Sequence, residues 1–182
     1  MSNHNKLSVF ISLILRHKPE VINIKLDEFG YANVDQLING IFKSGKHIDR
    51  NILQEIVEQD KKKRYSFNET KTLIRANQGH SINVNVPLEK KAPPEYLFHG
   101  TAEKSINSIS QQGINKMNRL YVHLSDNEET AYHVGKRHGK VIILKIATKR
   151  MFDEGYEFLL SENGVWLVDV VPTQYIVNLN ER

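Results

Sequence analysis

Cysteine is absent from the 182 residues, which excludes disulfide bonds, thiolate catalysis, iron–sulfur clusters and cysteine-ligated zinc. Long apolar runs are absent too. The longest, Leu7–Leu15, contains Ser8 and Ser12 and is far shorter than the about 18–20 residues that a membrane-spanning helix needs. The N-terminus has no apolar targeting stretch with a small-residue cleavage site. We therefore expect a cytoplasmic protein that does not engage membranes.

Several common enzyme motifs are also missing. The sequence contains no GxGxxG, HExxH or GxSxG motif and no paired-carboxylate motif. Gly135–Lys140 differs from a phosphate-binding loop, because its spacing is one residue short and Val141 replaces the Ser or Thr. His133 and His138 are five residues apart, a spacing that places them on different faces of a helix, so we predict no metal site.

The composition is that of a folded globular protein, with 40% hydrophobic and 25% charged residues. The formal net charge is +4, and residues 1–91 carry all of the excess, with a balance of +5 against −1 for residues 92–182. This asymmetry favours an anionic partner for the N-terminal half. A mildly basic surface without a partner is the alternative.

The first half is predicted to contain three helices. Apolar spacing over Leu7–Leu15 indicates the first, which Pro19 ends, so that Arg16 and His17 lie at its C-terminal end. There a cation also complements the helix dipole, which is a purely structural alternative for this pair. The second helix has Asn33 as N-cap, ends at Gly45, and has an inner face made of Val34, Leu37, Ile38, Ile41 and Phe42. The third follows Asp49, with Ile48 and Leu53 placed for a hydrophobic staple.

A β-hairpin is predicted to follow, with strands at Tyr65–Phe67 and Thr72–Arg75 around the turn Asn68–Lys71. Three short helices and a hairpin are typical of a winged-helix module. The polar stretch Pro87–Pro94 is predicted to be a linker.

Beyond the linker the sequence is β-rich, which makes the whole chain α+β. Strands are predicted at Tyr96–His99, Leu120–Leu124 and Val141–Ala147, with at least two more between Glu157 and Asn178. Helices are predicted at Ala102–Gln112, stopped by Gly113, and at Asp126–Arg137, with Asp126 as N-cap.

Five segments carry motifs that are rich in arginine, histidine, glycine, asparagine or small hydroxyl residues. They are Leu13–Glu20 (LILRHKPE), Ile74–Ser81 (IRANQGHS), Leu97–Thr101 (LFHGT), Tyr121–Ser125 (YVHLS) and Glu162–Trp166 (ENGVW). In order and spacing they resemble the RNA 2′-phosphotransferase family, the NAD-dependent enzymes that remove a splice-junction 2′-phosphate from tRNA. The resemblance runs from about Leu7 to Leu179. It implies an N-terminal winged-helix-like RNA-binding lobe at residues 1–90 and a C-terminal, β-rich, ADP-ribosyltransferase-like NAD-binding lobe at residues 91–182.

The resemblance also implies three groups of site residues. The catalytic tetrad is Arg16, His17, Arg64 and Arg119. The residues that resemble NAD contacts are His99, Gly100, Thr101, His123, Ser125, Asn163 and Gly164. The residues that resemble contacts to the substrate phosphate are Lys62, Arg75, His80 and Ser81.

The reaction implied by the resemblance transfers an internal RNA 2′-phosphate to NAD⁺ through an ADP-ribosylated RNA 2′-phosphate intermediate. The products are 2′-hydroxyl RNA, nicotinamide and ADP-ribose 1″,2″-cyclic phosphate. Guanidinium groups suit this chemistry because they match phosphate oxygens bidentately, and they replace a metal in charge neutralisation. Two roles are open to His17, a general acid or a hydrogen-bond donor to the phosphate. We expect a monomer that uses NAD as co-substrate and needs no metal.

Two other functions are compatible with parts of the sequence. The first is a winged-helix protein that binds nucleic acid without catalysis. The second is an ADP-ribosyltransferase that modifies proteins or nucleic-acid ends and leaves ADP-ribose on its target. Many such transferases use a glutamate to activate the nucleophile. Glu162 is the only nearby candidate, and we do not assign it that role.

Overall fold

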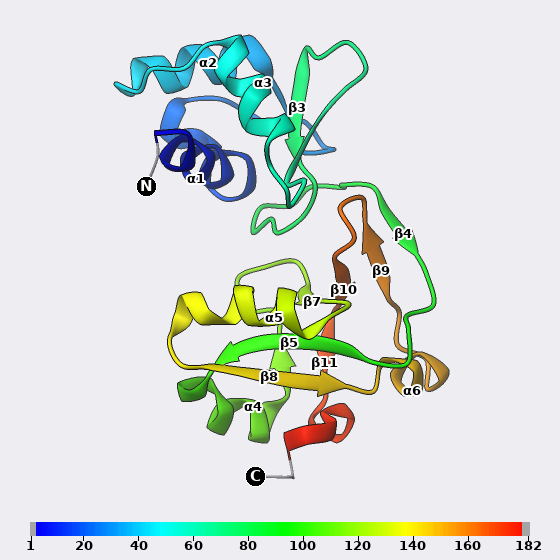
Figure 1. The fold of residues 1–182 in the computed structure, drawn as a ribbon. Coiled ribbons are helices and arrows are strands. Elements are labelled where there is room, and N and C mark those ends of the chain that lie inside the picture. The colour runs from blue at the N-terminus through cyan, green and yellow to red at the C-terminus, as the bar shows by residue number, and fades with distance from the viewer. Residues whose placement is uncertain (1–2, 180–182) are drawn as a thin grey trace. The chain divides into compact units, whose positions relative to one another are not determined.

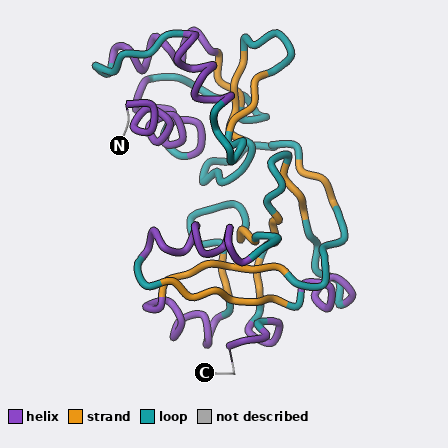
Figure 2. Tube along the Cα trace, in the orientation of Figure 1, coloured by secondary structure: helices purple, strands orange, loops and turns teal. Residues whose placement is uncertain are grey.

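The computed structural model describes residues 3–179, apart from the side chains of residues 3, 138 and 179, and its mixture of helices and strands confirms the α+β class (Figure 1). The chain divides into two compact units between Pro87 and Leu88. Figure 2 shows that each unit contains both helices and strands. The predicted boundary lay after residue 90. The predicted linker is wrong at Leu88–Lys90, because these residues form strand β4, which pairs with β9 (Leu159–Ser161).

The helices of the first unit begin and end close to where the sequence predicts. They are α1 (Asn3–Arg16), α2 (Val34–Lys43) and α3 (Arg50–Glu58), and a 3₁₀-helix that was not predicted, η1 (Pro19–Ile22), follows α1. Both predicted caps are confirmed. The side chain of Asn33 accepts a hydrogen bond from the backbone N of Gln36 at 3.0 Å, and that of Asp49 accepts one from Ile52 N at 2.8 Å.

The strands of the first unit form a three-stranded antiparallel sheet in the order β1-β3-β2, with β1 at Tyr31–Asn33, β2 at Tyr65–Phe67 and β3 at Leu73–Ala76. The predicted hairpin β2–β3 is confirmed. Strand β1 was not predicted, because a strand this short shows no alternation before helix α2 begins. In the central strand, Arg75 lies opposite Ser66 on one side and Tyr31 on the other.

The core of the first unit joins the three helices to the sheet, and its fully buried members include Ile11, Ile14, Leu15, Leu37, Ile41, Leu53 and Ile74. Phe42, predicted to face inward, is 61% exposed. The buried face of α2 is rotated towards Gly40, since η1 packs there and a Cβ on Gly40 would lie 2.9 Å from the carbonyl oxygen of Ile22. At about 100° per residue, Phe42 then points away from the core.

The strands of the second unit form one four-stranded and two two-stranded sheets. The four-stranded sheet has the order β4-β9-β10-β7, and the pairs are β5-β8 and β11-β6. The strands not yet introduced are β5 (Leu97–Ala102), β6 (Ile114–Asn115), β7 (Val122–Leu124), β8 (Val141–Ile146), β10 (Trp166–Val168) and β11 (Val170–Val171). An antiparallel bridge between Phe98 and Ser125 connects β5 to the end of β7.

The helices of the second unit are α4 (Ile106–Gln112), α5 (Glu128–Gly135) and α6 (Thr148–Asp153), with 3₁₀-helices η2 (Glu103–Ser105), η3 (Lys136–His138), η4 (Thr173–Tyr175) and η5 (Val177–Leu179). Gly113 ends α4 as predicted, with φ +72°. The predicted N-cap Asp126 is wrong, because Asn127 accepts the backbone hydrogen bond of Thr130 at 2.8 Å. Between residues 3 and 179, no helix is both long and apolar enough to cross a bilayer.

Helix α5 packs directly on strand β5, as Figure 1 shows. Two glycines permit the close approach. A Cβ on Gly100 would lie 1.7 Å from the carbonyl oxygen of Ala131, and one on Gly135 would lie 2.9 Å from the carbonyl carbon of Gly100. Only glycine fits at Gly100 unless the helix moves.

Candidate functional site

In the first unit, the end of α1 is joined to the loop that follows β3. The backbone N of Ser81 donates to the carbonyl oxygen of Arg16 at 3.0 Å, and Ser81 Oγ lies 2.9 Å from Nδ1 of His17. Gly79, with φ +87°, lies against the side chain of Arg16, because a Cβ at this position would be 3.6 Å from the guanidinium carbon. The loop therefore fixes both Arg16 and His17.

His80, the residue before Ser81, is buried, with only 2% of its surface exposed. Burial, and then the positive charges of Arg16, His17 and Arg75, lower the pKa of His80 to about 4. Its imidazole is therefore neutral at pH 7. Its Nε2 atom has no hydrogen-bond partner among the described residues and faces Gly30, where a Cβ would lie 3.5 Å away.

Arg75 belongs to the same group, since its charge reaches His80. It is 8% exposed, and its guanidinium carbon lies 4.7 Å from the centre of the Tyr31 ring. A cation in this position is stabilised by the face of the aromatic ring. We call Arg16, His17, Arg75, His80 and Ser81 the first-unit cluster.

Arg64 is held by a carboxylate that the sequence analysis missed. Asp60 Oδ1 pairs with Arg64 Nη1 at 2.5 Å, and Asp60 Oδ2 accepts the backbone N–H of Arg64 at 2.7 Å. Oδ1 also accepts the backbone N–H of Lys62 at 3.3 Å. The Asp60 side chain is 6% exposed and that of Arg64 is 26% exposed. One buried carboxylate thus fixes both the backbone and the guanidinium of Arg64.

Asn77 connects the entry of β2 to the exit of β3. Its backbone N–H donates to the carbonyl oxygen of Arg64 at 2.9 Å, and its Nδ2 donates to the carbonyl oxygen of Lys63 at 2.8 Å. Lys63 has φ 42°, so this hydrogen bond supports a left-handed turn that a lysine rarely adopts. The loop that begins at Asn77 continues to Gly79 and Ser81, which contact Arg16 and His17.

In the second unit, the two predicted histidines and Ser125 lie together at the bridge between β5 and β7. His99 Nδ1 lies 3.0 Å from the carbonyl oxygen of His123, and His123 Nδ1 lies 3.0 Å from that of Tyr121. Because a carbonyl oxygen only accepts, we infer that both Nδ1 atoms carry the proton. Phe98 and Ser125 exchange two backbone hydrogen bonds of 2.8 Å, which fixes the distance between the strands.

Arg119 belongs to this second group by its electrostatic effect. Burial lowers the pKa of His99, the hydrogen bond to His123 opposes that shift, and the charge of Arg119 lowers the pKa further. The guanidinium of Arg119 is itself partly desolvated, which together with the like charge of Arg137 lowers its pKa. We call His99, Arg119, His123 and Ser125 the second-unit cluster.

Comparison with known proteins identifies the family of this chain. Residues 2–170 match the profile of the RNA 2′-phosphotransferase, Tpt1 / KptA family. The chain belongs to the RNA 2′-phosphotransferase family. This confirms the resemblance seen in the sequence motifs, and it classes the chain as a transferase.

Individual relatives agree over nearly the full length. A probable RNA 2′-phosphotransferase of Fusobacterium nucleatum is 58% identical over 177 residues, which cover 97% of this chain and 99% of that protein. Proteins of the same description from Flavobacterium johnsoniae and Nostoc punctiforme are 49% and 48% identical, each covering 93–94% of both chains.

In this member of the RNA 2′-phosphotransferase family, Lys62 lies in the first unit, and the remaining residues predicted to contact NAD lie on β5 or in the turn between β9 and β10. Thr101 shares a face of β5 with His99, whereas Gly100 faces α5. The turn between β9 and β10 holds Asn163 and Gly164, and β10 pairs with β7 so that Leu167 lies opposite His123. The cofactor contacts predicted for these residues stay predictions, and packing alone already requires glycine at Gly100.

The tetrad predicted for this RNA 2′-phosphotransferase family member is divided between the units. Arg16, His17 and Arg64 belong to the first and Arg119 to the second. Asp60, four residues before Arg64, holds a predicted site residue and was missed by sequence reasoning, and an acid–base pair at this spacing was its only signal. Among the described residues, no three His, Asp or Glu side chains gather where they would hold a metal ion.

Proposed function

We propose that this protein transfers an internal RNA 2′-phosphate to NAD⁺. The reaction passes through an ADP-ribosylated RNA 2′-phosphate and gives 2′-hydroxyl RNA, nicotinamide and ADP-ribose 1″,2″-cyclic phosphate. The substrate is a tRNA-like RNA that carries an internal 2′-phosphate. The observation that carries the proposal is the first-unit cluster, in which Arg16 and His17 are fixed by Gly79 and Ser81 in a member of the RNA 2′-phosphotransferase family.

The folds of the two units support a division of labour. Three helices and a β1-β3-β2 sheet suit a winged-helix-like lobe that binds RNA, and this half of the sequence carries the positive excess. We assign the β-rich second unit as an ADP-ribosyltransferase-like lobe for NAD.

The first-unit cluster has the chemistry that a phosphate dianion requires. The 2′-phosphate is already anionic, so it needs orientation and charge neutralisation rather than deprotonation. Arg16 of this cluster, and Arg64 outside it, offer guanidinium forks that match phosphate oxygens, and each is held by a protein contact, with Gly79 and Asp60 respectively. Orientation of a bound phosphate by such preset groups contributes most of the rate enhancement in reactions of this kind.

His17 is the residue of the cluster that can move a proton. Its ring is oriented through Nδ1 by Ser81 Oγ at 2.9 Å. The RNA 2′-oxygen is a poor leaving group unless it is protonated, and an imidazolium can donate that proton as a general acid. A hydrogen bond from His17 to the phosphate is the alternative role.

The donor set of the second-unit cluster fits a dinucleotide. His99 and His123 are hydrogen-bonded to carbonyl oxygens through Nδ1, which fixes the direction of each ring. Thr101, Ser125 and the Asn163–Gly164 turn add hydroxyl, amide and backbone groups suited to a ribose or a carboxamide. When bound, NAD supplies an anomeric carbon with nicotinamide as a neutral leaving group. Arg119 contributes a positive charge beside His99.

The deciding experiment incubates the protein with a 2′-phosphorylated oligoribonucleotide, with and without NAD⁺, and identifies the products by mass spectrometry. We expect dephosphorylated RNA and ADP-ribose cyclic phosphate only when NAD⁺ is present. In the variants Arg64→Ala and Arg119→Ala we expect slower turnover and accumulation of ADP-ribosylated RNA, whereas Lys104→Ala, at an exposed lysine, serves as the matched control. Dephosphorylation that is equally fast without NAD⁺ would refute the proposal.

The same experiment separates the two other functions. A nucleic-acid-binding protein without catalysis would bind the oligonucleotide and leave it intact, whether or not NAD⁺ is added. An ADP-ribosyltransferase would leave ADP-ribose on the RNA as a final product in the unchanged protein. In both cases no cyclic phosphate is formed.

A further inference from the structure

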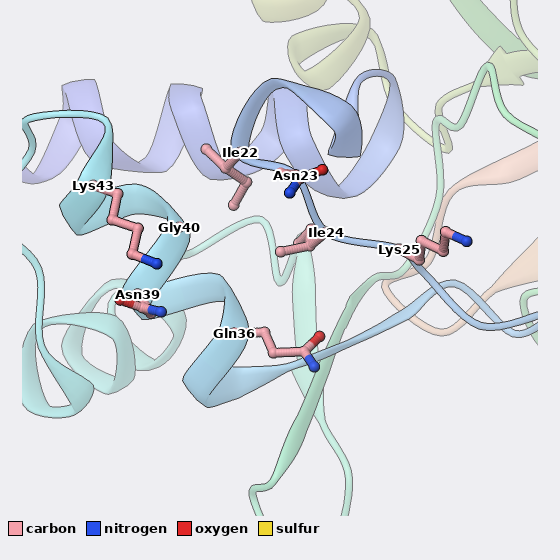
Figure 3. A pocket seen from close by; sticks show the side chains of 8 residues that line it. All are labelled: Ile22, Asn23, Ile24, Lys25, Gln36, Asn39, Gly40 and Lys43. Atoms are coloured by element: carbon pink, nitrogen blue, oxygen red, sulfur yellow. The ribbon is translucent and has the colours of Figure 1, made fainter.

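A groove in the first unit lies outside the first-unit cluster, between η1 with the residues that follow it and helix α2 (Figure 3). It has a volume of about 540 Å³. The lining residues are Ile22, Asn23, Ile24, Lys25, Gln36, Asn39, Gly40 and Lys43. We call this the η1–α2 groove. As Figure 3 shows, Ile22, Asn23, Ile24 and Lys25 belong to the end of η1 and the stretch after it, and the other lining residues belong to α2.

The groove is built by the local sequence. On α2, Gln36, Asn39, Gly40 and Lys43 follow helical spacing and therefore share one face. Gly40 lets η1 approach α2, since a Cβ there would lie 2.9 Å from the carbonyl oxygen and from Cδ1 of Ile22. Asn23, with φ 57°, turns the chain sharply after η1. The floor of the groove is thus set by backbone packing.

The polar lining of the groove is cationic and amide-rich. Two lysines, Lys25 and Lys43, and three amide side chains line it, and no carboxylate is among the lining residues. Lysine ammonium groups neutralise phosphates, and asparagine and glutamine donate hydrogen bonds to phosphate oxygens and sugars. The chemistry therefore fits the phosphodiester backbone of a nucleic acid better than a peptide or an apolar ligand.

The groove and the first-unit cluster are also close enough along the chain for one ligand to contact both. Asn23 is seven residues beyond Arg16, and at about 3.5 Å per extended residue their Cα atoms are separated by at most about 25 Å. The 3₁₀-helix between them shortens this span. An RNA that extends several nucleotides from the reacting one reaches from the cluster to the groove.

We propose that the η1–α2 groove binds the sugar–phosphate backbone of the substrate RNA, beyond the nucleotide that carries the 2′-phosphate. This inference rests on the proposed function and adds a second RNA contact to it. The groove increases affinity for long RNA and does not contribute to the chemical step. A short substrate that contacts only the first-unit cluster gains nothing from it.

The test compares a 2′-phosphorylated dinucleotide with a 2′-phosphorylated dodecamer as substrates for the wild type and for Lys25→Ala/Lys43→Ala. We expect the KM for the dodecamer to rise about tenfold, because two phosphate contacts are lost, with kcat unchanged. The kinetic constants for the dinucleotide should stay within twofold of the wild type. The control variant Lys6→Ala/Lys71→Ala removes the same charge from exposed positions of the first unit outside the groove. It should change the kinetic constants for either substrate by no more than twofold.

A binding measurement separates this inference from the proposed function. Fluorescence anisotropy with an unphosphorylated dodecamer requires no catalysis. The slope of log K against log salt is negative. For Lys25→Ala/Lys43→Ala we expect its magnitude to fall by about 1.4, at about 0.7 for each lost single-strand phosphate contact. If the wild type turns over neither substrate, but the groove variant weakens binding of this RNA and the control variant does not, the proposed function fails and the groove assignment stands. Equal losses for groove and control variants, or for long and short substrates, would overturn the groove assignment.

Discussion

Asp60 is the most informative residue to change, because its buried carboxylate holds both the backbone N–H and the guanidinium of Arg64. Asp60→Asn keeps the size of the side chain and removes its charge. The amide can still accept the backbone N–H of Arg64, but its other end is an NH₂ group that points at the guanidinium. The variant therefore removes the charge-assisted hydrogen bond without creating a cavity.

The size of the effect follows from the burial of the pair. A hydrogen bond to a charged group contributes about 1.5–3 kcal/mol. The Arg64 side chain is 26% exposed, so solvent screens part of this interaction and the lower half of the range applies. We expect the free energy of unfolding to fall by about 2 kcal/mol, which corresponds to a melting temperature about 4–8 °C lower for a chain of this size.

Activity should change mainly through Arg64, because the other hydrogen bond of Asp60 Oδ1, from the backbone of Lys62, is long at 3.3 Å. We expect Asp60→Asn to lower kcat on a 2′-phosphorylated oligonucleotide about tenfold or more, because a loosened guanidinium no longer meets the phosphate in a fixed orientation. In the background of Arg64→Ala, Asp60→Asn should cost little further activity. The assays are thermal denaturation by circular dichroism and steady-state kinetics at a temperature where all variants are folded.

A matched control exists in the same unit. Asp35 pairs with Arg50 on the surface, where the two side chains are 76% and 50% exposed. Asp35→Asn should change the free energy of unfolding by less than about 0.5 kcal/mol and leave kcat unchanged. The reasoning is refuted if the two aspartate variants behave alike, or if the losses in kcat from Asp60→Asn and Arg64→Ala multiply in the double variant.

Two further predictions follow from packing and from titration. Gly100→Ala places a methyl group where α5 crosses β5, so the second unit should lose cooperative thermal unfolding. Gly45 lies in open space at φ +84°, so Gly45→Ala should lower the free energy of unfolding by only about 1–2 kcal/mol. Equal melting curves for the two variants would contradict this prediction. Because the pKa of His80 is about 4 in the folded chain and near 6.5 when unfolded, the unfolded state binds the proton first, so stability is complete above about pH 6.5 and falls towards pH 4. Urea titrations across this range should show a weaker pH dependence for His80→Gln, and an unchanged slope would exclude His80 as the source.

Much of the fold could be predicted because local signals are strong where capping residues and apolar spacing coincide. Asn33 and Asp49 start α2 and α3 where predicted, and the end of α1 at Arg16 follows from Pro19. The short strand β4 and helix α6 carry too few residues for a periodic pattern. Phe42 was misplaced because the direction of the buried face depends on a distant contact, that of Gly40 with Ile22.

The candidate site could be predicted only in part. Arg16, His17 and Ser81 were identified through family motifs, whereas their contact across 64 residues of sequence follows from tertiary structure alone. Asp60 was missed because a carboxylate in a basic stretch has the sequence signal of an ordinary surface pair. The packing demand on Gly100 depends on a helix that begins 28 residues later, and no local pattern reports it.

The loop from Asn77 to Ser81 limits which insertions and deletions the first unit can accept. One end of the loop is tied to the carbonyl groups of Lys63 and Arg64, and the other end is tied to Arg16 and His17. These five consecutive residues therefore set the distance between Arg64 and the pair Arg16 and His17, which are far apart in the sequence of the unit. A single residue inserted into this segment would move one cation relative to the other, so we expect its length to matter more than that of a turn that connects no such groups.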